Sequence, residues 1–196
     1  MSGGDRGGET GDAALAALIA RAGTIGPNPP VERWEPANCG ALDIVIRSDG
    51  RWYYQGTPID REPLVRLFAS VLRRDEDGGY FLVTPAEKVA ITVEDAPLLA
   101  VECHFAGSGR DQILTVRTNV GDVVAADAQH PLRFAVDRAN GGLKPYLKVR
   151  GRLEALASRA VAQEIAGRAE EAEHAGERWY GLWSGGCFFP MAPVED

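Results

Sequence analysis

The sequence predicts an α+β fold of two domains that share a duplicated hairpin-and-strand motif. A strand hairpin and an amphipathic helix in the first half indicate a sheet with a helix packed on it. The hairpin "VIRSDGRWYY" at 45–54 is similar to "TVRTNVGDVV" at 115–124. The Tyr-led run "YFLV" at 80–83 is similar to "YLKV" at 146–149. The same order of elements, repeated after roughly 70 residues, indicates a gene duplication.

The length of 196 residues is enough to bury one large core or two small ones. We assign a tail, a short helix and a Pro-rich link to 1–30, an N-terminal α+β domain to 31–96 and a C-terminal α+β domain to 97–196. The apolar content of 45% and the charged content of 25% are typical of a globular protein. No apolar run approaches the roughly 20 residues that cross a bilayer, so we expect no membrane partner.

Charge and cysteine content narrow the class of protein further. The net charge of −7 argues against binding of a nucleic acid polymer, which depends on positive surface. The cysteines are odd in number and far apart, which predicts buried, reduced thiols rather than a disulfide framework. These cysteines are Cys39, Cys103 and Cys187. We therefore expect a cytoplasmic protein.

The N-terminal stretch predicts disorder, then a short helix, then a stiff link. Residues 1–11 are Gly-rich and polar, which is typical of disorder. Asp12 is placed to cap a helix that Gly23 ends. The "GPNPP" run at 26–30 predicts extended chain. The buried side of the helix is expected to comprise Leu15, Leu18, Ile19 and Ala22.

The N-terminal domain is expected to start with a hairpin followed by a helix. Leu42, Ile44 and Ile46 alternate along a strand, and the "SDG" run turns the chain back into "RWYYQ". Asp60 is placed to cap the helix, which the "DEDGG" run is expected to end. The apolar stripe of this helix comprises Leu64, Val65, Leu67, Phe68, Val71 and Leu72.

The run "GGYFLVTPAEKVAITVE" at 78–94 joins two strand-like stretches through the start of a helix. Thr84 and Pro85 suit the cap and the first helical position, and Glu87 is placed to reach back to the cap amide. The β-branched residues that follow Lys88 disfavour a continuing helix. We interpret the stretch as a single capped turn between two strands, and the alternative is an open turn that holds an anion.

The C-terminal half predicts strands, one long helix and a packed tail. The strands are expected at 98–105 and 132–136, with an "ANGG" turn at 139–142. A long helix is expected from near Gly151, with Leu153, Leu156, Ala160, Val161 and Ile165 as its buried stripe and the "EEAE" run as its end. The tail "WYGLWSGGCFFP" has too much apolar surface to remain free, so it should pack on the body.

The chain carries no recognisable catalytic or metal motif. Ser184 lacks the Gly-x-Ser-x-Gly pattern, and Cys103 and His104 would point to opposite faces of a strand. The sequence has no Cys-x-x-Cys, no His-x-x-x-His, no Asp-rich loop and no Gly-rich phosphate loop. We therefore expect no catalytic residue, no metal and no cofactor, which points away from an enzyme.

Two polar stretches remain as candidate ligand sites. Tyr146, Lys148 and Arg150 alternate along one strand, which places a ring and two cations on one side. Such a side can stack a flat heterocycle and bind its phosphate, and the alternative is a solvated strand face. At the other stretch, the amides after Thr84 together with Lys88 would attract an anion, in competition with Glu87.

Several long runs resemble the bacterial family called domain of unknown function 1285. They extend from about Trp34 to Phe189 and include "DGRWYYQGTPIDREPLVRLFASVL", "DGGYFLVTPAEKVAITVEDAPL", "TNVGDVV" and "YLKVRGRLEAL". The resemblance implies two α+β domains, the C-terminal one superficially similar to pleckstrin-homology-like folds. It further implies a pocket at the domain interface suited to a nucleotide-like ligand, and a role in signal transduction.

We therefore predict a cytoplasmic binding or regulatory protein that holds a small anionic, nucleotide-like ligand at the domain interface. The candidate ligand-binding residues are Trp52, Thr84, Lys88, Tyr146 and Arg150. Two alternatives stay open. One is a protein-interaction module that uses a sheet edge or the Trp-rich tail. The other is a hydrolase of a phosphorylated small molecule, which requires His, Asp or Cys side chains converging in one cleft.

Overall fold

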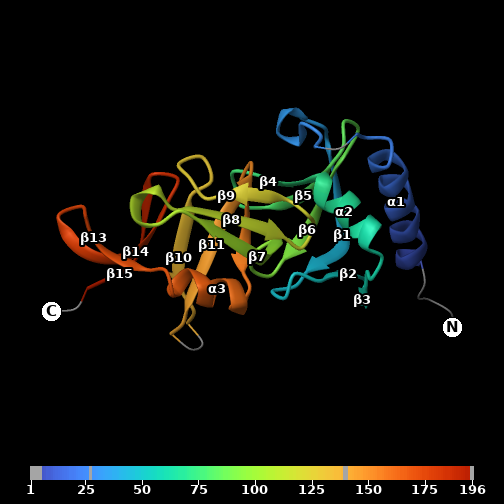
Figure 1. The fold of residues 1–196 in the computed structure, drawn as a ribbon. Helices are drawn as coiled ribbons and strands as arrows, with labels where there is room; N and C mark the ends of the chain where they lie inside the picture. Colours follow the sequence, from blue (N-terminus) through green and yellow to red (C-terminus); the bar gives the residue numbers. More distant parts are fainter. Residues whose placement is uncertain (1–5, 27, 139–140, 195–196) are drawn as a thin grey trace. The chain divides into compact units, whose positions relative to one another are not determined.

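The chain forms two compact units, Met1–Asp95 and Ala96–Asp196, in a computed structural model (Figure 1). The structure describes residues 6–26, 28–138 and 141–194. Each unit contains its own six-stranded sheet together with helices. The predicted two-domain, mixed α and β fold is confirmed.

The N-terminal unit is a sheet of strand order β3-β2-β1-β6-β5-β4. Its elements are α1 (Arg6–Ala22), η1 (Val31–Arg33), β1 (Asn38–Ile46), β2 (Trp52–Tyr54), β3 (Thr57–Pro58), α2 (Glu62–Ser70), β4 (Leu72–Arg74), β5 (Tyr80–Val83) and β6 (Lys88–Val93). The first and last strands, β1 and β6, are parallel and lie at the centre, whereas the other pairs are antiparallel.

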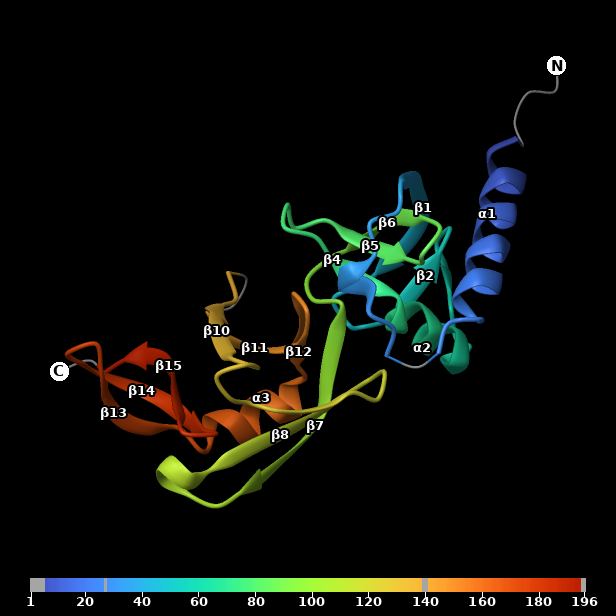
Figure 2. The ribbon, with the colours of Figure 1, turned by 90° about the horizontal axis from the view of Figure 1, so that it is seen from above.

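The C-terminal unit has the sheet order β10-β11-β12-β7-β8-β9 and a separate three-stranded sheet, β13-β14-β15 (Figure 2). Its elements are β7 (Leu98–Ala106), η2 (Gly109–Asp111), β8 (Ile113–Thr118), β9 (Val123–Ala125), β10 (Leu132–Val136), β11 (Leu143–Arg150), β12 (Leu153–Ala157), α3 (Arg159–Ala166), β13 (Glu170–His174), β14 (Glu177–Ser184) and β15 (Cys187–Pro193).

The two six-stranded sheets repeat one topology. Read from the opposite edge, the second sheet is β9-β8-β7-β12-β11-β10, which matches the first strand by strand. Its first and last strands, β7 and β12, are again the parallel pair at the centre. Tyr80 and Tyr146 therefore lie on equivalent strands, as the sequence repeat indicated. The similarity between 45–54 and 115–124 does not follow this correspondence. It aligns β1–β2 with β8–β9, whereas the shared topology aligns β1–β2 with β7–β8. The β1–β2, β7–β8 and β8–β9 hairpins all contain a glycine between their strands, so this pattern does not define the phase.

The helix α1 starts earlier than the sequence indicated. It begins at Arg6, so Asp12 lies inside the helix and not at its cap, and residues 6–11 are helical where disorder was expected. The predicted disorder of residues 1–5 falls outside the described residues. Gly11 lies against the side chains of Tyr54 and Gln55, and the Tyr54 hydroxyl donates to the Asp12 carboxylate at 3.0 Å. This contact with the hairpin supports turns that local propensity disfavours.

The helix α2 also differs from expectation at both ends. Its cap position is Arg61 and not Asp60, and no side chain bonds the cap amides. It ends at Ser70, so Leu72 belongs to β4, and the "DEDGG" run forms the β4–β5 turn rather than a helix end. Leu72 is fully buried in the sheet, which explains why its position also fits the apolar stripe of a helix.

The long C-terminal helix predicted from Gly151 is wrong. Residues 153–157 form β12, and only α3 is helical, capped by Ser158, whose hydroxyl accepts a hydrogen bond from the Val161 amide. Leu153 and Ala155 are 1% and 0% exposed and lie on the same face of β12. Because Leu156 is also apolar, the alternation of apolar and polar residues that indicates a strand is hidden in the sequence. The acidic run at 170–173 belongs to β13.

The C-terminal tail packs on the body, as predicted. The strands β14 and β15 form a hairpin in which Leu182 and Phe189 are buried. The buried Ser184 hydroxyl accepts from the Leu114 amide of β8 at 2.9 Å and donates to the Ala126 carbonyl at 2.6 Å. Residues 139–140 of the predicted "ANGG" turn lie outside the described residues, although β10 and β11 on either side pair as a hairpin.

Candidate functional site

The predicted residue Trp52 belongs to the core of the N-terminal unit. Its ring is 2% exposed and stacks on Phe68 of α2 at a centroid distance of 6.0 Å. The indole nitrogen has no hydrogen-bond partner among the described residues. Trp52 therefore fixes α2 on the sheet, and a ligand could reach its ring only if this packing changed.

The Thr84 turn is a tight connection between β5 and β6, as the sequence indicated. Thr84 is fully buried, and its hydroxyl accepts from the Glu87 amide at 3.2 Å and the Ala86 amide at 3.4 Å. The Thr84 amide donates to the Glu87 carbonyl at 2.9 Å. The Glu87 carboxylate does not reach back to the cap, because it forms an ion pair with Arg21 of α1 at 2.7 Å. These amides therefore already have acceptors within the turn.

Lys88, the first residue after the Thr84 turn, belongs to a charged cluster with Asp75 and Arg73. Its ammonium group lies 2.9 Å from an Asp75 carboxylate oxygen and 4.5 Å from the centre of the Phe81 ring. The other partner of Asp75 is Arg73, at 2.7 Å. Burial alone would raise the pKa of Asp75, but hydrogen bonds from Arg73 and Lys88 outweigh it and hold the pKa below its ordinary value. Lys88 thus already has an anionic partner.

The two predicted residues of the C-terminal unit lie on β11. Tyr146 is 6% exposed, and the Arg133 guanidinium lies over its ring at 4.0 Å while bonding both oxygens of Glu154. The Arg150 guanidinium donates to Asp122 at 3.2 Å. Arg133 therefore occupies the position over the ring at which a heterocycle would stack.

The thiols differ from the prediction of three buried groups. All three are free, but Cys39 is exposed, and Cys103 and Cys187 are only partly buried. Burial, followed by a hydrogen bond with Glu164, raises the pKa of Cys103 to about 11, so this thiol is a poor nucleophile at neutral pH. In the described part of the chain, no group of three His, Cys, Asp or Glu side chains is placed to hold a metal ion.

A hydrolytic triad is also not assembled around Ser184. The nearby Asp127 and His130 approach each other at 3.2 Å, and two backbone amides together with His130 lower the pKa of Asp127. However, the Ser184 hydroxyl is fully buried and bonded to backbone groups of the body, so it serves the tail hairpin.

A hollow of about 700 Å³ lies between α3 and the β10–β11 hairpin, within the C-terminal unit, and we call it the α3 pocket. Such a volume suits a small molecule. It is lined by Phe134, Asp137, Gly142, Leu143, Lys144, Pro145, Leu156, Ala157, Arg159, Ala162, Gln163, Ile165, Ala166 and Met191. Its walls are mainly apolar, and the exposed side chains of Leu143 and Val136 extend the apolar surface at the hairpin.

The polar groups of the α3 pocket favour an anion. The lining contains Lys144 and Arg159 against the single carboxylate of Asp137, in a chain whose net charge is −7. Arg159 is exposed at the first position of α3, and it has no acidic partner among the described residues. The positive end of the helix dipole lies at the same place. The pocket can therefore hold an apolar body and pair its charged group with Arg159.

Comparison with known families matches both units. Residues 29–96 match the N-terminal domain of DUF1285, described as a domain of unknown function, and residues 97–191 match the DUF1285 C-terminal domain. The chain belongs to the DUF1285 family. No curated protein matches it.

Two solved DUF1285 structures are similar to the chain. One, a DUF1285 family protein from Silicibacter pomeroyi DSS-3, is 45% identical, with a TM-score of 0.83 over 90% of this chain and 95% of that chain. The other, from Shewanella baltica OS155, is 30% identical, with a TM-score of 0.50 over 65% of this chain and 92% of that chain. In the described part of this DUF1285 chain, no helix is both long and apolar enough to cross a membrane.

The residues of the α3 pocket were missed by the sequence-based reasoning. The sequence pattern predicts one long helix after Gly151, without the break between β12 and α3, both of which line the pocket. The one signal available was Ser158, a good N-cap residue directly before Arg159.

Proposed function

We propose that this DUF1285 protein is a binding protein for a small anionic molecule with an apolar body, and that the α3 pocket holds it. The observation that carries the proposal is a pocket of about 700 Å³ with apolar walls and an unpaired arginine at its rim, in the described part of an acidic chain. Binding of a regulatory ligand would agree with a role in signal transduction.

Binding is favoured over hydrolysis by the chemistry of the lining. The lining residues of the α3 pocket include Asp137 but no histidine or cysteine and no second carboxylate. General acid–base catalysis most often uses histidine or a pair of carboxyl groups, and this lining offers Asp137 and Lys144 in their place. The hydrolase alternative therefore receives less support than a binding role.

The nature of the apolar body stays open between a flat heterocycle and an aliphatic chain. Phe134 is the only aromatic residue among the lining residues, whereas Leu143, Ile165 and Met191 are aliphatic. A nucleotide-like ligand at the domain interface, contacted by the five residues predicted from the sequence, remains a separate prediction, as does the pleckstrin-homology-like character of the C-terminal unit.

The proposal is tested by thermal shift with anionic probes. We expect AMP or decanoate at about 1 mM to raise the melting temperature, because a ligand that binds only the folded state stabilises it. Arg159→Gln should raise the probe concentration that gives the same shift at least about tenfold. This corresponds to the loss of about 1.4 kcal/mol of binding free energy from one charge-assisted hydrogen bond. Arg168→Gln is the matched control, since Arg168 lies beyond the other end of α3 over the Phe105 ring.

A second variant distinguishes binding in the α3 pocket from binding at other sites. Ala162 lines the pocket from α3 and is partly exposed, so Ala162→Phe should fill the hollow and abolish the shift. A shift that survives Ala162→Phe but is lost in Lys88→Gln or Arg150→Gln would move the site to the residues predicted from the sequence. The absence of any shift with the whole panel would contradict the proposal.

A further inference from the structure

The three-stranded sheet of the C-terminal unit has one docked face and one outward face. Side chains alternate along β14, and Leu182 and Ser184 on one face are both 0% exposed. Ser184 and the carbonyl of Trp183 tie this hairpin to the body through Leu114 and Gln112. The Trp183 ring lies on the opposite face and is partly exposed.

The outward face contains a continuous row of rings, which we call the ring face. Trp179, Trp183 and Phe188 are partly exposed, and His174 is exposed. The centroid distances along the row are 6.4 Å from Trp179 to His174, 5.9 Å from His174 to Phe188 and 5.2 Å from Phe188 to Trp183. The rings are tilted or perpendicular to one another, so edges and faces alternate along the surface.

Gly181 makes this row continuous. A Cβ atom at Gly181 would lie 2.3 Å from the Phe188 ring and 2.6 Å from the Phe189 carbonyl. Phe188 therefore crosses over β14 at this glycine and reaches toward His174 of β13. A side chain at position 181 would separate the row into two parts.

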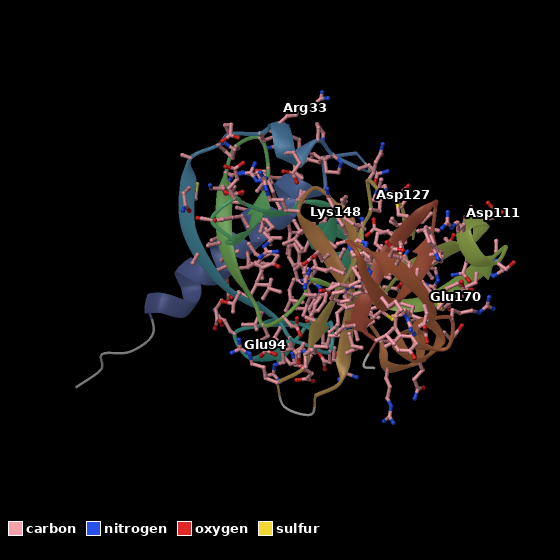
Figure 3. All side chains as sticks on the ribbon, turned by 90° about the vertical axis from the view of Figure 1, so that its left-hand side faces the viewer. Arg33, Glu94, Asp111, Asp127, Lys148 and Glu170 are labelled. Atoms are coloured by element: carbon pink, nitrogen blue, oxygen red, sulfur yellow. The ribbon has the colours of Figure 1, made fainter. Side chains whose placement is uncertain are left out.

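Carboxylates share the ring face. Glu170 pairs with Gly181 across the ladder and Glu177 pairs with His174, so both lie on the side of the rings (Glu170 is labelled in Figure 3). Both are exposed, and in the described part of the chain neither has an ion-pair partner. On the opposite face, by contrast, Glu171 pairs with Arg178 at 2.7 Å. The ring face thus combines ring surfaces with unpaired negative charge.

One cation of the chain already uses this row. The Arg110 guanidinium of η2 lies 4.9 Å from the centre of the Trp183 ring at the end of the row. Cations bind to indole faces through the ring quadrupole, and nearby carboxylates strengthen the attraction. Arginine or lysine side chains of another molecule would find the same chemistry at Trp179 and Phe188, with Glu170 and Glu177 as counter-charges.

We propose that the ring face docks a basic, extended peptide segment of a partner protein. Charge complementarity selects this occupant, because the rings and unpaired carboxylates both favour arginine and lysine. A second copy of this chain is disfavoured as the occupant, since it would bring Glu170 and Glu177 against the same residues. The surface is separate from the α3 pocket and goes beyond the proposed small-molecule function.

The test is fluorescence anisotropy with the full chain and synthetic octapeptides of alternating Arg and Thr or alternating Glu and Thr. We expect the basic peptide to bind, with affinity that falls as salt rises, and the acidic peptide not to bind. Trp179→Ala should weaken binding at least about tenfold, since hot-spot aromatic residues dominate interfaces. Tyr180→Ala, the next residue and 42% exposed on the opposite face, should leave it unchanged.

The contribution of the carboxylates to peptide binding is tested with a matched pair of variants. Glu170→Gln should weaken the basic peptide several-fold, whereas Glu173→Gln removes the same charge from the opposite face of β13 and should not. Circular dichroism checks that each variant is folded. Equal binding of both peptides, equal effects of Trp179→Ala and Tyr180→Ala, or dimerisation through Trp179 would overturn the proposal.

Discussion

At the residue scale, the buried charge of the N-terminal unit is organised around Arg73. Its side chain is 6% exposed, and the guanidinium donates to the Val31 carbonyl at 3.0 Å, to the Trp34 carbonyl at 2.6 Å and to Asp75. Asp75 in turn bonds Lys88. The cluster therefore holds the chain segment before β1 against β4, and its charges are compensated within the unit.

Removal of the carboxylate from this cluster should destabilise the fold. Asp75→Asn leaves the buried Arg73 without its anionic partner, so we expect a loss of about 2–4 kcal/mol in the free energy of unfolding at pH 7. The native pKa of Asp75 is lowered, so its stabilisation is present above the unfolded pKa of about 4 and is lost as pH falls through the native pKa.

Urea titrations of the wild type and the variant check this prediction. The difference between the two proteins should be largest near neutral pH and should shrink below about pH 4. Asp49→Asn is the control, because Asp49 lies in an exposed turn, where it accepts from the Arg51 amide at 3.0 Å and lies 4.0 Å from the Arg51 guanidinium. A difference that did not depend on pH would contradict the ion-pair explanation.

At the element scale, a buried hydroxyl helps to fix the β14–β15 hairpin on the body. Ser184 occupies the last position of β14 and satisfies both the Leu114 amide and the Ala126 carbonyl. The following Gly185 has φ of +56° and passes so close to Asp127 that a Cβ atom would lie 2.9 Å from its side chain. Both residues therefore allow the turn to approach the body closely.

Ser184→Ala should loosen this hairpin. The substitution leaves a buried amide and a buried carbonyl without partners, so we expect a loss of about 1–3 kcal/mol from the C-terminal unit. Hydrogen exchange should show reduced protection in β14 and β15 and unchanged protection in β1 and β6. Equal loss of protection in both units would argue against a local role for Ser184.

At the scale of the whole molecule, two sheets of the same topology each enclose their own core. The N-terminal core includes Trp52 and Phe68, and the C-terminal core includes Leu114, Leu147 and Ile165. The six strands β1 to β6 all lie in Met1–Asp95, and the six strands β7 to β12 all lie in Ala96–Asp196. Such units resemble the products of duplication, each with the set of strands that it needs to fold.

Each unit should therefore fold when it is produced alone. Residues 1–95 and residues 96–196 should each show a single cooperative urea transition by circular dichroism. The C-terminal fragment should also retain any probe bound in the α3 pocket, because all of the lining residues lie within it. A fragment without a cooperative transition would mean that its core depends on the other unit.

Part of the candidate sites could be read from the sequence. The ring face lies in the tail whose apolar content predicted packing, but its alternation became clear only with the pairing of β13 and β14. The five ligand residues are predicted from residue type and spacing, whereas the partner of Lys88 is Asp75 in the β4–β5 turn and the cation over the Tyr146 ring is Arg133 of the neighbouring strand β10. Sequence patterns do not reveal such partners, because those partners are brought close only by folding.

The sequence by itself determined the two-domain mixed fold, the β1–β2 hairpin, and the tight turn between β5 and β6, because each depends on a local alternation or a turn residue. Tertiary structure decided the start of α1, where Tyr54 donates a hydrogen bond to Asp12, and the division of 153–166 into β12 and α3. It also decided that Trp52 would be buried. In these cases, contacts between distant segments outweighed local preference, through a hydrogen bond at α1 and through buried apolar surface at β12 and Trp52.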